Sequence, residues 1–182
     1  NKPKIHLEKL FSLMESENVS FRDLEQTVLK FKNIKIHIVG DVIVDKYNDC
    51  STLGQTTKTP TFSLKKNSEK QYIGGAGIVA KHLKNLGANV IFTSIIGDDK
   101  LGAYVKNNLS ASKIKFNHIV DKSRNTTLKE RFWAENYKII QVDTVDNHVP
   151  SQEIINRIRD KILNIKSDGI IFSDFRHGIF NK

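Results

Sequence analysis

From residue 34 onward, short runs of β-branched residues alternate with segments of helical spacing, and this alternation constrains the fold more than any other feature. The runs predicted as core strands are 34–39, 90–96, 115–120 and 169–172, and the predicted helices are 79–86, 101–109 and 154–165. Strands that alternate with helices are typical of a parallel sheet with helices on both faces. The sequence therefore predicts an α/β fold built on such a sheet.

Two stretches, about 52–72 and 126–143, do not fit this alternation. They are rich in Thr, Lys, Phe, Tyr and Val, and they contain period-two patterns such as Thr-Phe-Ser-Leu-Lys at 61–65. Such patterns are typical of strands with one exposed face. We therefore expect both stretches to form antiparallel strands outside the main sheet, as a small β lid.

Residues 1–33 differ in pattern and are predicted to form a helical linker or extension. Apolar residues recur at helical spacing in two segments, and Ser20 is suited to cap the second. The apolar positions are Leu7, Leu10, Phe11, Met14, Phe21, Leu24, Val28, Leu29 and Phe31. The first residue is Asn1 rather than a methionine, which fits a piece of a longer protein.

The net charge of +9 raises the question of nucleic-acid binding. The excess is mostly lysine, with six arginines, and it is scattered along the chain, which favours a solvated surface or attraction of small anions. No run approaches the length of a membrane span, no signal-peptide core is present, and Cys50 is the only cysteine. We expect a soluble, cytoplasmic protein without a nucleic-acid or membrane partner.

Acidic residues follow three of the predicted core strands, where ligands bind in an open parallel sheet. Asp41 and Asp45 follow the first strand, Asp98 and Asp99 the second, and Asp174 the fourth. Carboxylates there can accept charge-assisted hydrogen bonds from sugar hydroxyls, or they can cap helices and bind loop amides. Capping is favoured for Asp98 and Asp99, and both roles stay open for Asp45 and Asp174.

Two further patterns could bind an anion or a sugar. Gly74 and Gly75 precede a predicted helix, where backbone amides could approach a ligand, although a glycine turn needed only for packing fits as well. Lys129 and Arg131 lie two positions apart, so on a strand both cations would face one side and could converge on one anion. A solvated lid strand is the alternative for this pair.

Taken in order, these motifs resemble the PfkB/ribokinase family of carbohydrate kinases. The matching segments are IVGDVIVDKY (38–47), GGAGIVAKHLKNLGA (74–88), IGDDKLG (96–102), TTLKER (126–131) and SDFRHG (173–178). Within the family, the first and last segments are similar to the kinase domains of bifunctional heptose-phosphate kinase/nucleotidyltransferases. The resemblance covers about residues 34–182.

The resemblance implies a ribokinase-like sheet with a β lid that closes over a sugar, and ATP-dependent phosphorylation of a sugar or a heptose-like sugar phosphate. It implies ATP and Mg²⁺ as cofactors and a homodimer formed through the lid. The implied substrate-binding residues are Asp45 for a sugar hydroxyl, Gly74 and Gly75 for backbone contacts, Asp174 in the pocket, and Lys129 and Arg131 for a phosphate.

The sequence departs from the family pattern at two positions. Ile78 stands where the family usually has Asn, and His177 stands where heptose kinases usually have Lys. In the family, the Gly-Ala-Gly-Asp motif with the anion hole and base aspartate would lie downstream of Lys182. We therefore expect no catalytic or metal-binding residue in this chain, which would be inactive alone. The alternative is a non-catalytic sugar-binding or regulatory module, including one fused to a nucleotidyltransferase.

Overall fold

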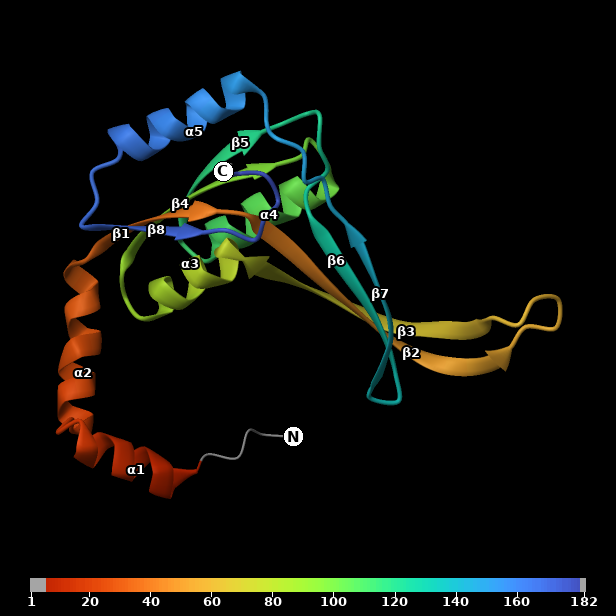
Figure 1. Cartoon of the computed structure of the whole chain (residues 1–182), viewed down its shortest axis with the longest axis horizontal. Coiled ribbons are helices and arrows are strands. Elements are labelled where there is room, and N and C mark those ends of the chain that lie inside the picture. Colours follow the sequence, from red (N-terminus) through yellow and green to blue (C-terminus); the bar gives the residue numbers. More distant parts are fainter. Residues whose placement is uncertain (1–5, 181–182) are drawn as a thin grey trace.

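The computed structural model describes residues 6–180, and its helices and strands follow the predicted alternation (Figure 1). The helices are α1 (Leu7–Ser16), α2 (Phe21–Lys30), α3 (Ala76–Asn85), α4 (Lys100–Ala111) and α5 (Gln152–Asn164), with a 3-10 turn η1 (Phe31–Asn33). The strands are β1 (Lys35–Gly40), β2 (Val42–Gln55), β3 (Phe62–Gly75), β4 (Asn89–Ile96), β5 (Lys115–Val120), β6 (Leu128–Ala134), β7 (Tyr137–Thr144) and β8 (Gly169–Ser173).

The central sheet has four parallel strands in the order β5-β4-β1-β8. Helices α3 and α4 cover one face, where Ile38 and Phe92 are fully buried. Helix α5 covers the other face, where Ile154 and Ile158 pack against Val39. The predicted parallel sheet with helices on both faces is confirmed.

A second sheet, in the order β3-β2-β6-β7, projects from the parallel sheet as a lid (Figure 1). Its two hairpins, β2–β3 and β6–β7, are antiparallel, as predicted. The expectation of purely antiparallel strands is wrong at the centre, where β2 pairs with β6 in parallel. Both strands leave the carboxyl edge of the parallel sheet, and they therefore run outward in the same direction.

The lid is longer than the sequence predicts. Only Asp41 separates β1 from β2, and β3 continues to Gly75, directly before α3. The first lid segment therefore spans 42–75 rather than 52–72. The boundary was hidden because Val42, Ile43 and Val44 are buried and continue the apolar run of β1.

Helices α1 and α2 extend away from the parallel sheet, and none of their residues is buried (Figure 1). A capping box starts α2: Asp23 N donates to Ser20 Oγ at 3.2 Å, and Ser20 N donates to Asp23 Oδ2 at 2.8 Å. The packing partner of this predicted extension stays open, and its residues 1–5 lie outside the described range. Between residues 6 and 180, no helix has the length and hydropathy that a membrane crossing requires.

Candidate functional site

Asp41 joins the strand ends that flank the candidate site. It is buried, and its Oδ2 accepts hydrogen bonds from Phe175 N at 2.9 Å and His177 N at 3.3 Å. Its carbonyl oxygen accepts from Ala76 N at 2.8 Å, at the start of α3. Burial raises the pKa of the Asp41 carboxyl; the two amides act against this rise, and the charge of Asp174 adds to it. Asp41 thus holds β1, α3 and the segment after β8 together.

Asp45 lies on the lid strand β2 rather than in a strand-end loop, so the predicted position is corrected. Its Oδ1 accepts a hydrogen bond from Arg131 Nη1 of β6 at 2.5 Å. A Cβ atom at Gly74 would come within 2.1 Å of the other carboxylate oxygen. The Arg131 and Asp45 side chains are 18% and 22% exposed. The absent side chain of Gly74 therefore leaves room for the Asp45 carboxylate beside the arginine.

An open groove of about 550 Å³ lies beside this ion pair. Its walls are Asp45, Tyr47, Tyr72, Ile73, Gly74 and Ile78. The rings of Tyr47 and Tyr72 meet edge to face with centroids 5.8 Å apart, and the Arg131 guanidinium lies 5.2 Å from the Tyr47 centroid. Aromatic walls with one carboxylate suit a polyhydroxylated ring, because the ring packs on the aromatics while its hydroxyls donate to the carboxylate.

Lys129 and Arg131 lie two positions apart on β6, so their side chains share one side of the lid. Lys129 Nζ lies 3.3 Å from Asp143 Oδ2 on β7, and Gln141 Nε2 also donates to this carboxylate. Each of the two predicted lid cations thus has a carboxylate partner. Sequence reasoning missed Asp143, whose place opposite Lys129 depends on the register of the β6–β7 hairpin.

The lining of the groove does not include Gly75 or Asp174. Gly75 has φ +58°, and a Cβ atom there would meet the Asp41 carbonyl oxygen at 2.3 Å, so glycine is required for the backbone to pass. Asp174 is exposed and accepts a hydrogen bond from Arg176 N at 2.7 Å. The structure therefore brings Asp45, Gly74 and Arg131 together and leaves Asp174 beside Asp41.

His177 lies in the segment after β8, where its imidazole Nδ1 is 3.0 Å from Asn147 Oδ1. Burial lowers the pKa of its imidazole below the ordinary value, although the charge of Asp41 acts against this shift. The charge of Lys129 lowers this pKa further, whereas the charges of Asp143 and Asp174 raise it. His177 therefore shares the electrostatic field of both parts of the candidate site.

Arg124, which sequence reasoning also missed, fixes the segment that carries His177. The guanidinium is buried, and it donates to the carbonyl oxygens of His177 at 3.1 Å and His148 at 2.9 Å. Its Nε donates to Asp121 Oδ2 at 2.9 Å. A single arginine in a predicted loop gives no sequence signal for such a role, because its partners are distant carbonyl groups.

Asp99 has the capping role that the sequence favours. Its Oδ1 accepts from Gly102 N in the first turn of α4 at 2.7 Å, and its Oδ2 accepts from Thr126 N at 2.7 Å. The carboxylate therefore joins α4 to the segment before β6. Asp98 is exposed beside it.

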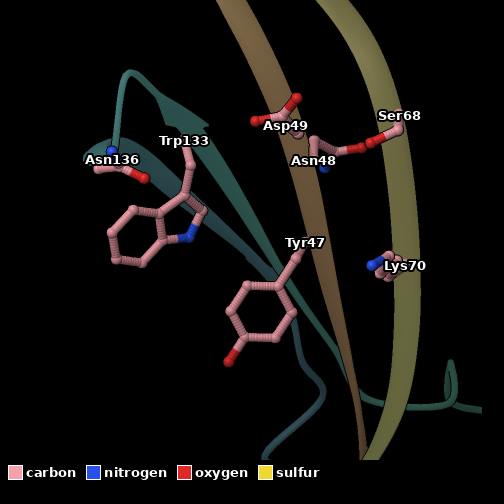
Figure 2. Close-up of a pocket in the computed structure, with 7 residues that line it drawn as sticks. All are labelled: Tyr47, Asn48, Asp49, Ser68, Lys70, Trp133 and Asn136. Carbon is pink, nitrogen blue, oxygen red and sulfur yellow. The ribbon is translucent and has the colours of Figure 1, made fainter. Parts of the chain in front are cut away.

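A second hollow, of about 500 Å³, lies farther along the lid (Figure 2). Its lining residues are Tyr47, Asn48, Asp49, Ser68, Lys70, Trp133 and Asn136. Tyr47 also lines the first groove, so aromatic and charged side chains continue from Asp45 toward Trp133. The Trp133 Nε1 atom is enclosed and has no hydrogen-bond partner among residues 6–180.

The described residues offer little to a metal. Among residues 6–180, no three His, Cys, Asp or Glu side chains are placed to hold an ion. The cations of the groove, Lys129 and Arg131, are already paired with carboxylates.

Comparison with known proteins places the chain in a family. Residues 33–157 match the model of the pfkB family carbohydrate kinases. The chain belongs to the PfkB family. It is 33% identical over 147 residues to the bifunctional protein HldE of Campylobacter jejuni strain RM1221, covering 80% of this chain and 30% of that protein. HldE of Helicobacter pylori strain P12 is 35% identical over 152 residues, covering 81% of this chain and 32% of that protein. The chain thus spans about a third of these relatives.

Solved structures agree with PfkB membership at the level of the fold. The tetrameric inhibited form of Escherichia coli phosphofructokinase-2 matches with a TM-score of 0.63 and 14% identity, over 81% of this chain and 47% of that one. A carbohydrate kinase from Agrobacterium tumefaciens matches with a TM-score of 0.57 and 17% identity, over 76% and 45% of the two chains. The predicted ribokinase-like α/β fold and the predicted PfkB relationship are therefore confirmed.

Proposed function

We propose that the intact protein is an ATP-dependent kinase of a sugar or sugar phosphate, and that this PfkB chain supplies the sugar-binding half and the lid. The observation that carries the proposal is the position of Asp45, whose carboxylate lies at an aromatic groove between Gly74 and Arg131. In this proposal Asp45 accepts a hydrogen bond from a sugar hydroxyl, and the backbone at Gly74 and Gly75 contacts the ring.

A phosphorylated, heptose-like sugar is the substrate class that we propose. Two observations support it: the similarity to HldE proteins, and the presence of Lys129 and Arg131 on one side of β6 beside the groove. A phosphate group suits such a pair, because it carries close to two negative charges and several acceptor oxygens. Asp174 is proposed to contact the substrate from the strand-end side when the lid closes.

ATP and Mg²⁺ are proposed to bind outside residues 6–180, and the 182-residue chain is proposed to be inactive alone. This proposal is supported by coverage: the chain spans under half of the solved kinases that it matches. Phosphoryl transfer depends on groups that position and stabilise the transferring phosphate. These groups are proposed to come from another part of the intact protein.

The test is a coupled assay of ADP release with hexoses, pentoses and heptose phosphates, on the full-length protein and on the 182-residue chain. Sugar-dependent ADP release by the full-length protein alone supports the proposal. Turnover by the isolated chain at a comparable rate would contradict the assignment of catalysis to another part. Absence of turnover in both, with sugar binding retained, would favour the alternative below.

The alternative is a non-catalytic sugar-binding or regulatory module. The observation in its favour is Ile78, an apolar residue in the groove wall where the family resemblance expects an amide. Loss of one polar contact weakens sugar recognition without removing the groove. Calorimetric sugar binding combined with no ADP release separates this module from a kinase.

Three further proposals concern the surroundings of the site. A homodimer through the lid is supported by exposed apolar side chains of β7, with Ile140 and Val142 52% and 47% exposed. Sedimentation at micromolar concentration showing only monomers would exclude this dimer.

Residues 1–33 are proposed to be a helical extension from residues 34–182. A cytoplasmic location is proposed from the PfkB relationship.

A further inference from the structure

We propose that Asp45 and Asp143 are built-in competitors for the two lid cations, so that the phosphate of a substrate must displace them and thereby frees Asp45 to bind a sugar hydroxyl. This inference rests on the proposed function and adds a rule for substrate choice. The site would favour ligands that carry both a phosphate and a hydroxyl-bearing ring over ligands with only one of the two.

The strand register places the four charges in one block. Across the parallel β2–β6 pair, Asp45 is opposite Lys129, and across the β6–β7 hairpin Lys129 is opposite Asp143. Arg131 lies two residues beyond Lys129 on the same side and reaches back to Asp45. The charges of two cations and two carboxylates therefore cancel on a single face of the lid, beside the groove.

Each of the two carboxylates is already bound to a lid cation, so the phosphate of a substrate has to displace it from that cation. Arg131 holds Asp45 Oδ1, while the other oxygen lies against Gly74. Burial raises the pKa of Asp143, but hydrogen bonds from Gln141 and Lys129 and the charge of Arg131 bring it below its ordinary value. Asp143 thus stays ionised at neutral pH and keeps Lys129 engaged.

A phosphate group can win this competition because it carries more charge and more acceptor oxygens than one carboxylate. The planar guanidinium of Arg131 can bind two phosphate oxygens at once, a geometry that arginine supplies better than lysine. When Arg131 turns to the phosphate, Asp45 loses its partner in the groove. A sugar hydroxyl can then donate to the freed carboxylate and reduce its repulsion from the phosphate.

The two recognition events are consequently coupled. A neutral sugar meets a carboxylate that is already engaged, and inorganic phosphate has to break an ion pair without a hydroxyl to compensate. Each ligand therefore improves the binding of the other by the same factor, because coupling between two sites is reciprocal.

The experiment measures the affinity of inorganic phosphate for the full-length protein by calorimetry. The lid component of binding is defined as the part that is lost in Arg131→Gln. The test variants are Asp45→Asn and Asp143→Asn, each of which removes one competitor with little change in shape. The matched control is Glu130→Gln, which removes one negative charge from the opposite side of β6, where Glu130 pairs with Lys46.

We expect Asp45→Asn and Asp143→Asn each to tighten phosphate binding at the lid about two- to fivefold, the upper part of the range for release of a partly exposed ion pair. Glu130→Gln should change it less than twofold. The proposal is overturned if the Asp variants match the Glu130 control or weaken binding. It is also overturned if Arg131→Gln leaves the phosphate affinity of the protein unchanged, because no phosphate binding would then depend on the lid.

These outcomes separate the inference from the proposed function. If phosphate binding is insensitive to Asp45 and Asp143 while the wild-type protein releases ADP in response to a sugar, the competition fails and the kinase stands. If the Asp45 and Asp143 variants tighten phosphate as expected but no sugar supports ADP release, the lid site stands and the kinase assignment fails.

Discussion

The carboxylate of Asp45 fills the space that a side chain on Gly74 would need, since a Cβ atom there would lie 2.1 Å from Asp45 Oδ2. The two residues are diagonal neighbours at the root of the β2–β3 hairpin, where Gly74 pairs with Ile43 and Asp45 pairs with Tyr72. The glycine therefore determines where the carboxylate can stand, and through it where Arg131 is held.

Gly74→Ala is expected to push the Asp45 carboxylate away from the groove and weaken sugar binding about tenfold, the loss of roughly one hydrogen bond to a charged group. The thermal midpoint should fall little, because the atom in the way is the end of a side chain that can turn. Calorimetry and thermal unfolding of the full-length protein measure both effects. The control is Gly169→Ala, where a Cβ atom meets only Ile36 Cδ1 at 3.4 Å. Normal sugar affinity in Gly74→Ala would contradict this reasoning.

Asp45→Ala is expected to weaken sugar binding by about 1.5–3 kcal/mol, the range for a hydrogen bond to a charged group. The measurement is calorimetric titration with an unphosphorylated sugar of the ADP-release panel, because release of Arg131 would offset part of the loss for a phosphorylated ligand. Asp49→Ala, four positions farther along the same strand and outside the first groove, is the control and should bind normally. Equal affinity in wild type and Asp45→Ala would remove Asp45 from the site.

The sequence predicts the parallel sheet well because its signals are local. The buried strand 90–96 is rich in β-branched residues, and glycine or capping residues mark the helix ends. The start of the lid could not be predicted in this way, since Val42–Val44 are as apolar as the core strand before them.

The candidate site is only partly accessible to sequence reasoning. The two-residue spacing correctly indicates that Lys129 and Arg131 share one side of a strand. No local pattern shows that Asp143 is the partner of Lys129 or that Asp45 is the partner of Arg131. The contact of Asp45 depends on the parallel β2–β6 pairing, which joins residues about 85 positions apart in the chain, and the contact of Asp143 depends on the register of the β6–β7 hairpin. Long-range register is decided by the packing of the whole lid rather than by local propensity.

Ile78→Asn is expected to raise sugar affinity, because it places an amide in the wall of the groove where an apolar side chain now stands. Ile78 is 37% exposed, so the change in stability should stay within about 1 kcal/mol. Ile78→Leu, which keeps an apolar side chain of similar size, is the control. An unchanged or weaker sugar affinity in Ile78→Asn would show that this wall does not contact the hydroxyls.

Asp121→Asn is expected to destabilise the protein at pH 7 by about 3 kcal/mol, because it leaves the buried Arg124 without its carboxylate. Burial raises the pKa of Asp121, but bonds from Ser123 and Arg124 bring it below the ordinary 3.8. Its stabilising contribution is therefore present above pH 3.8 and is lost as the pH falls through the lower, folded value. Urea unfolding at pH 7 and pH 3 should show the difference from wild type shrinking in acid. The exposed Asp160→Asn should differ little at either pH.

Asp41 is the only residue between β1 of the parallel sheet and β2 of the lid, so the lid would rotate about this edge of the parallel sheet. A strand of 14 residues such as β2 is about 46 Å long, so a rotation of about 10° at its base moves the far end by about 8 Å. The return strand β3 enters α3 without a connecting loop, and Ala76 N is bonded to the Asp41 carbonyl oxygen. Any swing of the lid is therefore transmitted to the first turn of α3, which makes the amide of Ala76 a sensitive spectroscopic reporter of lid position.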